Sequence, residues 1–217
     1  MHANSHSRIG LGIIVSLIAV CTAGADIINI VENSSFETPE ISNGRHWNIF
    51  ASIPGWQLSR GPAIEIQRGV NGWAAADGAQ LLELDADIDG PGGGMHGEDA
   101  STAIFQDLNT LAGQDYQLTF AFSPRPGVAD NALEILWDGQ LVDTLSADGR
   151  GLSNTDWSYH TYILPATDVT TRLEFGDLSE SNSLGTFIDD ISVTAHIPEP
   201  ASLVLLAMGS LPLLHKR

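Results

Sequence analysis

Apolar and polar residues alternate with a period of two along most of this chain. Successive side chains of a β-strand point to opposite faces, so this alternation predicts half-buried strands. Clusters of Gly and Pro separate the runs, and no long segment has helical periodicity. The clearest runs are 63–67, 80–85, 116–122, 133–137, 140–142, 157–164, 171–175 and 186–194.

An Asp138-Gly139 pair lies between two of these runs and predicts a tight hairpin, since both turn residues need positive φ. About ten short strands predict an all-β chain, built as an antiparallel two-sheet sandwich of jelly-roll type. Trp137 shares its face of the alternation with Leu133 and Ile135, which places it in the core.

The N-terminus has the composition of a secretory signal peptide. Residues 1–8 are polar with one basic residue, 9–20 are apolar, and Ala23-Gly24-Ala25 gives an Ala-x-Ala pattern. We therefore expect an N-terminal signal helix at 1–25, cleaved after Ala25, and export through the Sec pathway. The alternative is lipidation at Cys21. Cleavage after Ala25 would leave a mature protein without cysteine and so without disulfides.

The C-terminus has three parts: Pro198-Glu199-Pro200, the apolar run 203–214, and Lys216-Arg217. The two prolines end regular structure, which separates a body at 26–196 from a tail at 197–217. The apolar run is shorter than the ~20 residues that span a bilayer comfortably. We therefore expect transient insertion into the inner membrane rather than a permanent transmembrane anchor.

This arrangement resembles the PEP-CTERM sorting signal of Gram-negative bacteria. The resemblance implies an exosortase-like processing enzyme as a partner, and delivery to the cell surface or the extracellular polymer. Pro198, Glu199 and Pro200 are the residues of this chain that match the motif.

The formal net charge is −18, and all but one of the acidic residues lie in the body. Such a surface repels phosphate backbones, so nucleic acid is not expected as a partner. Exported acidic domains that are poor in Lys often hold Ca²⁺, because hard cations take carboxylate oxygens.

The body also resembles the galactose-binding-like jelly rolls, a group with many carbohydrate-binding modules. The resemblance rests on Asn33-Ser34-Ser35-Phe36-Glu37, Ile53-Pro54-Gly55-Trp56 and the final run 187–193, with a strand, a Gly turn and an aromatic strand over 104–120. It implies carbohydrate binding, and a structural Ca²⁺ held by Glu37 and by Asp189 or Asp190. Which aspartate would ligate the ion stays open.

The alternation in 187–193 predicts that Asp189 shares a face with Phe187, Ile191 and Val193. A carboxylate on an apolar face needs a cation or donors to satisfy it. The alternative to calcium is that Asp189 accepts backbone N–H groups of a loop. A second acidic run, Asp85-x-Asp87-x-Asp89, matches only half of an EF-hand loop, and we expect it to be solvated.

No nucleophile–base pair and no metal-ligand spacing of histidines is visible, so we expect no enzyme. Trp56 and Trp73 follow turn residues and are our candidates for stacking on sugar rings. The expected function is that of an exported, non-catalytic protein that binds exopolysaccharide. The alternatives are a matrix component without a specific ligand, and a small secreted glycoside hydrolase.

Overall fold

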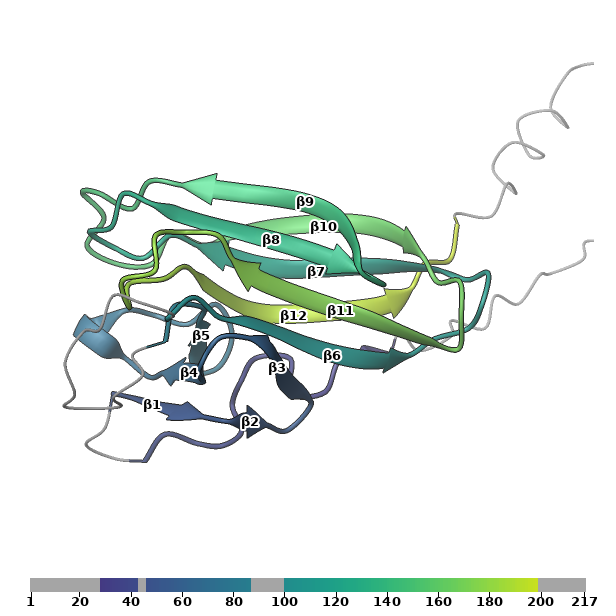
Figure 1. Ribbon diagram of the computed structural model, residues 1–217, viewed down its shortest axis with the longest axis horizontal. Helices are drawn as coiled ribbons and strands as arrows, with labels where there is room; N and C mark the ends of the chain where they lie inside the picture. The colour runs from purple at the N-terminus through teal and green to yellow at the C-terminus, as the bar shows by residue number, and fades with distance from the viewer. Residues whose placement is uncertain (1–27, 43–45, 87–99, 199–217) are drawn as a thin grey trace, which may run out of the picture.

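The computed structural model describes residues 28–42, 46–86 and 100–198. Their strands form two six-stranded antiparallel sheets that pack face to face (Figure 1). Across sheet A the order is β1 (Trp47–Phe50), β4 (Ile64–Gln67), β5 (Leu81–Glu83), β12 (Phe187–Ala195), β7 (Asp115–Ser123) and β10 (Ser158–Pro165). Across sheet B it is β2 (Ser52–Ile53), β3 (Trp56–Arg60), β6 (Ala103–Asn109), β11 (Thr170–Asp177), β8 (Asn131–Trp137) and β9 (Gln140–Ala147). The predicted two-sheet sandwich of jelly-roll type is confirmed.

The period-two pattern sets which side chains enter the core. In β8, Leu133, Ile135 and Trp137 are buried, while the residues between them are half-buried on the outer face. The predicted β8–β9 hairpin is also present, with φ of 52° at Asp138 and 72° at Gly139. Trp137 is 5% exposed, which confirms its place in the core.

The centre of the core is aromatic. Trp56 is completely buried between Phe36, 5.7 Å away between ring centroids, and Phe175, 6.3 Å away. Its indole N–H donates to the carbonyl oxygen of Asn33 at 3.3 Å. The Asn33–Phe36 turn is thereby fixed to the core by the residue that follows the β2–β3 turn.

A β-bulge in β12 changes the alternation predicted for 187–193. The register with β7 shifts between Asp189 and Ser192, and Asp190 has a φ of 47°. Asp189 therefore shares the outer face of sheet A with Phe187, whereas Ile191 and Val193 point into the core. The prediction that all four share one face was wrong, because one extra residue reverses the phase of a strand.

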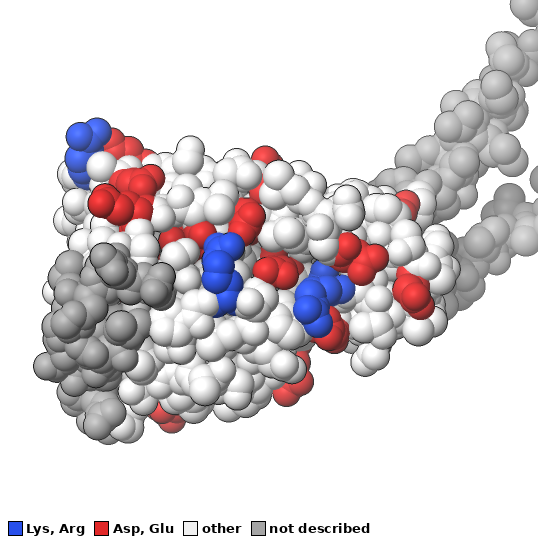
Figure 2. Space-filling view, viewed as in Figure 1, with Lys and Arg blue, Asp and Glu red and all other residues white. Residues whose placement is uncertain are grey.

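Basic side chains on the outer face of sheet B are paired with acids. Arg172 lies 2.7 Å from Asp107, and Arg60 lies 3.3 Å from Glu134. Seen from the same side as Figure 1, Figure 2 shows few basic side chains on this face, with acidic side chains next to them. The described residues of this face therefore form no basic patch.

Within the described ranges, no helix is long and apolar enough to cross a membrane. The predicted signal peptide at 1–25, residues 199–217 of the predicted sorting signal, and Asp87 and Asp89 lie outside the described residues. The first described residues, 28–31, run beside β12, where the Ile30 N–H donates to the Val193 carbonyl at 2.9 Å.

Candidate functional site

Sheet A has an outer face rich in hydroxyl and amide groups on β7, β10 and β12. The strand registers place Thr161, Thr119 and Ser192 in one row, and Ile163, Gln117 and Thr194 in the next. The hydroxyl oxygens of Thr119 and Thr161 lie 3.2 Å apart. All of these side chains are exposed or half-buried. Together with Tyr159, the polar members form what we call the platform: Gln117, Thr119, Tyr159, Thr161, Ser192 and Thr194.

Tyr159 is the exposed aromatic residue of the platform. It is 56% exposed, and its hydroxyl donates to Asp190 Oδ2 at 2.8 Å. This hydrogen bond to a carboxylate, helped by burial, raises the pKa of Tyr159 to about 12. The bulge that turns the backbone at Asp190 therefore also holds the Tyr159 ring by its hydroxyl, while much of the residue stays open to solvent.

Segment 70–80, which begins with the 3-10 helix η1 (Val70–Gly72), packs against the same face next to the platform. Its Trp73 ring lies 5.6 Å from Phe187 in β12. Its backbone N–H groups at Ala76 and Asp77 donate to Asp189 Oδ2 at 2.7 and 3.0 Å. The Trp157 indole N–H donates to the Ala74 carbonyl at 2.9 Å, which joins the segment to the start of β10.

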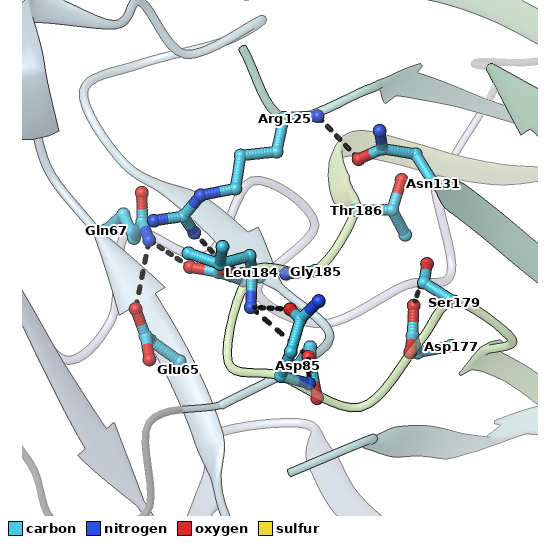
Figure 3. Close-up of polar contacts among 12 residues, drawn as sticks. Glu65, Gln67, Asp85, Arg125, Asn131, Asp177, Ser179, Leu184, Gly185 and Thr186 are labelled. Carbon is cyan, nitrogen blue, oxygen red and sulfur yellow. Dashed lines mark hydrogen bonds and ion pairs between the residues drawn. The ribbon is translucent and has the colours of Figure 1, made fainter. Parts of the chain in front are cut away.

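A buried charged network lies beside segment 70–80 (Figure 3). The cross-strand neighbours Glu65 and Glu83 both accept hydrogen bonds from the Gln67 side-chain amide, at 2.9 Å for Glu65. Arg125 pairs with Glu83, and its guanidinium lies 5.2 Å from the Trp73 ring. Residues 65, 67 and 83 are each at most 3% exposed.

Burial raises the pKa of Glu83 well above its usual value, since desolvation penalises the carboxylate. The Arg125 charge acts in the opposite direction, and the neighbouring Glu65 raises the pKa further. The network is thus a cluster of desolvated charged groups. The protonation of Glu83 on β5 depends on its ion pair with Arg125, which lies at the start of the β7–β8 connection.

A separate groove of about 670 Å³ opens beside sheet B, where β6 extends past the start of β3. Polar side chains contribute much of its lining, among them Glu32, Gln57, Gln106, Asp107 and Asn109. The Gln106 side chain is fixed there, because it exchanges two hydrogen bonds with the backbone of Glu32.

Residues 29–194 match the model of the family described as "Protein of unknown function (DUF642)". This chain belongs to the DUF642 family. No curated protein matches this chain.

Among solved structures, the DUF642 domain is similar to TmCBM61 in complex with beta-1,4-galactotriose, with 18% identity over 78% of this chain and 99% of that one, and a TM-score of 0.45. It is also similar to a family 35 carbohydrate binding module from an environmental isolate (17% identity, 68% and 91% covered, TM-score 0.43). A third is the K2 cleaved adhesin domain of Lys-gingipain (9% identity, 76% and 96% covered, TM-score 0.45). The assignment of the fold rests on the two sheets themselves.

The two tryptophans predicted to stack on sugars have different surroundings in the DUF642 domain. Trp56 lies against the sheet B groove but is 0% exposed, so it has no free ring face and its predicted role is wrong. Trp73 is 8% exposed and packs between Phe187 and Arg125. It therefore holds segment 70–80 and leaves little surface for a ligand.

The predicted calcium ligands meet around segment 70–80. Glu37 Oε1 accepts the N–H groups of Ala79 and Gln80 at 2.7 and 2.8 Å. Asp189 accepts three backbone N–H groups, two on Oδ2 and that of Asp190 on Oδ1. Acceptance of backbone N–H groups of a loop is the role that sequence reasoning gave as the alternative to calcium for Asp189. Burial raises the pKa of the Asp189 carboxyl to about 7.

Within the described part of the DUF642 domain, no three His, Cys, Asp or Glu side chains gather as they would around a metal ion. Glu37 and Asp189 instead direct oxygens to backbone donors, and Asp190 directs one to Tyr159. Calcium shared by Glu37 and the Asp189–Asp190 pair therefore stays a prediction.

Sequence reasoning did not single out Tyr159, Glu83 or Arg125. The run 157–164 carries aromatic or apolar residues on both faces, so alternation alone did not show which aromatic faces water. Glu83 and Arg125 are 42 residues apart and meet only through the sheet. Asp85, expected in a solvated loop, is completely buried, which corrects that prediction.

Proposed function

We propose that this DUF642 chain is an exported, non-catalytic protein that binds carbohydrate on the platform of sheet A. The observation that carries the proposal is the exposed Tyr159 ring, held by Asp190, beside a row of hydroxyl and amide groups. Sugars combine apolar ring faces with many hydroxyls, so an aromatic ring next to short polar side chains is complementary to them.

The same proposal includes export and sorting. A signal peptide at 1–25 and a sorting signal at Pro198, Glu199 and Pro200 would direct the chain through the inner membrane to an exosortase-like enzyme. A protein delivered to the cell surface would meet exopolysaccharide there, and exopolysaccharide is therefore the proposed polysaccharide partner. The support for this part is the sequence of the two ends.

The absence of catalysis is also part of the proposal. Glu65 and Glu83 bring two carboxyl groups together as cross-strand neighbours, which is the residue type a glycoside hydrolase needs. However, Glu65 is 3% exposed and Glu83 is 1% exposed, and Gln67 hydrogen-bonds to both. A glycosidic bond would not reach them in this arrangement.

A glycan array probed with the purified exported protein tests the proposal. We expect retention on a defined set of polysaccharides, and loss of that retention in Tyr159→Ala. The matched control is Gln57→Ala, which alters the sheet B groove and should leave retention unchanged. Loss in Gln57→Ala alone would move binding to the groove, and no retained glycan at all would favour a matrix component without a ligand. Release of shortened sugars would indicate a hydrolase.

A further inference from the structure

Among the residues that the structure describes, three buried oxygen atoms near the ends of β5 and β11 have no hydrogen-bond partner. They are Asp85 Oδ1, Asp177 Oδ2 and Ser183 Oγ. The three residues are 0%, 1% and 6% exposed. Leaving a buried polar oxygen unsatisfied costs free energy, so three such atoms in one region call for a ligand.

Backbone contacts bring these residues together from three parts of the chain. Asp85 Oδ2 accepts the N–H groups of Asn182 and Leu184 at 2.7 and 3.2 Å, so Ser183 lies between its two donors in the chain. The Asp177 N–H donates to Thr102 O at 2.9 Å, and the Thr102 N–H donates to Leu84 O at 2.8 Å. Residue 102 thus links the chain at Asp177 to the residue preceding Asp85.

The two carboxyl groups carry like charge in a desolvated region. Burial raises the pKa of both acids, to about 6 for Asp177, and the charge of Asp85 is a further cause at Asp177. Ser179 donates to Asp177 Oδ1 at 2.7 Å, which leaves Oδ2 as the unsatisfied atom. Arg125 lowers the pKa of Asp85, but it is already paired with Glu83. Arg60 Nη2 donates to the backbone carbonyl of Asp177 at 2.7 Å, and this arginine is paired with Glu134. Among the described residues, neither arginine forms an ion pair with the carboxylate of Asp85 or Asp177.

We propose that Asp85, Asp177 and Ser183 bind a divalent cation of the calcium class through these three oxygens. Every free atom is a hard oxygen, and Ca²⁺ takes carboxylate, hydroxyl and carbonyl oxygens together with water. Ca²⁺ takes six to eight oxygen ligands, so water and carbonyl groups would complete the coordination. This site is distinct from the one predicted at Glu37 and Asp189.

Such an ion would connect the two sheets. Asp85 follows β5 of sheet A, Asp177 ends β11 of sheet B, and Ser183 lies in the connection to β12. A ligand that binds only the folded state stabilises it by mass action. The ion would accordingly cross-link the two sheets at this end of the sandwich and stabilise the folded state.

Thermal unfolding of the full mature protein, stripped with EDTA and then titrated with CaCl₂, tests the proposal. At a hundredfold excess of free Ca²⁺ over Kd, we expect the melting temperature to rise by about 5–10 °C. Asp177→Asn keeps the shape of the side chain and removes its charge, so it should fold and lose most of this rise. Ser183→Ala provides a second, milder variant if Asp177→Asn is unstable, and it should weaken Ca²⁺ binding.

Glu37→Ala is the matched control, because it alters the other predicted calcium site, and it should keep the rise. A wild-type melting temperature that does not respond to Ca²⁺ would mean that protons neutralise these acids instead, and would overturn the proposal. A response that survives Asp177→Asn and disappears in Glu37→Ala would overturn it too, and would place the ion at the N-terminal motif. Calorimetric titration with CaCl₂ should give one binding site fewer per chain in Asp177→Asn than in the wild type, and an equal number of sites in both would overturn the proposal.

Discussion

Aromatic residues in this domain are used in two ways that their local sequence does not distinguish. Trp56 follows a Pro-Gly turn, which is a loop context, yet it is completely buried between the sheets. Tyr159 lies within the predicted strand 157–164, which has aromatic or apolar residues on both faces, yet it is more than half exposed. The difference arises from the face of the sheet: Trp56 points into the core, where it contacts Phe175 of the same sheet, whereas Tyr159 lies on the outer face of sheet A opposite Ala121.

Trp56→Ala should therefore lower stability rather than remove a binding contact. Replacing a large buried aromatic leaves a cavity and costs about 3–5 kcal/mol in the free energy of unfolding. Urea unfolding followed by circular dichroism would measure this loss, with Trp157→Ala, at a half-buried position, as the comparison. A loss below about 1 kcal/mol for Trp56→Ala would contradict the assignment of Trp56 to the core.

Tyr162 provides the test of pH dependence. Its hydroxyl donates to Asp143 Oδ2 at 2.8 Å, and burial together with this bond raises its pKa to about 12. The folded state then holds the phenolic proton more tightly than the unfolded chain, whose Tyr pKa is about 10. Stability from this group is fully present below pH 10 and is lost as the pH rises toward 12.

Melting curves between pH 9 and 12 would show this loss. Tyr162→Phe should flatten the decline in melting temperature above pH 10, because it removes the titrating group and keeps the ring. An equally steep decline in Tyr162→Phe would show that other groups control alkaline unfolding.

At the level of elements, alternation predicts the strands and the Asp138-Gly139 hairpin, but it does not predict their exceptions. The bulge at Asp190 adds one residue to β12, and nothing in the pattern of 187–193 marks it. That residue reverses the faces of Ile191 and Val193 relative to Asp189 and brings Asp190 to Tyr159. The candidate site was therefore only partly predictable: the Asp189–Asp190 pair was singled out from the sequence, while the exposed Tyr159 was not.

Contacts between residues far apart in the sequence are the second feature that the alternation does not predict. Glu83 accepts hydrogen bonds from Arg125, from Gln67 and from the backbone N–H of Gly185, which come from three separate segments. Each residue alone is ordinary in the sequence. Only the order β4–β5–β12–β7 brings them to one place.

Glu83→Ala should accordingly be strongly destabilising. It leaves the Arg125 guanidinium, whose side chain is 14% exposed, without its partner, and breaking a buried pair in this way costs about 3–5 kcal/mol. The control is Asp148→Ala, which breaks an exposed pair with Arg150 and should not change stability measurably. Similar urea midpoints for both variants and the wild type would contradict the structural role of the network. Should Glu83→Ala fail to fold, Glu83→Gln, which keeps an acceptor, should retain part of the stability.

At the scale of the whole molecule, the sandwich body carries the proposed ligand surface, and the two ends of the sequence carry the predicted signal peptide and sorting signal. Both ends of the described body are held against sheet A. Residues 28–31 run beside β12, and the His196 N–H donates to the Asp115 carbonyl at 2.8 Å. Pro198 lies two residues after His196. A sorting tail placed there would be handled by an enzyme without disturbing the sheets.

Pro198→Ala combined with Glu199→Ala should leave the protein unprocessed in the inner-membrane fraction. The double change removes the motif that the proposed exosortase-like enzyme would read and leaves the sandwich intact. Mass spectrometry of the fractionated cells would measure it, with Tyr159→Ala as a control that should be sorted normally. A mature form of unchanged mass and location would contradict the sorting proposal.

The most direct test of the central claim is the affinity of the purified protein for the polysaccharide that it retains best, measured by calorimetry. Truncating an aromatic residue at the centre of a binding surface typically costs about 2 kcal/mol or more, so Tyr159→Ala should weaken binding by about 30-fold. Tyr159→Phe keeps the ring and should bind within a few-fold of the wild type. Wild-type affinity in Tyr159→Ala, with the fold intact, would contradict binding on the platform.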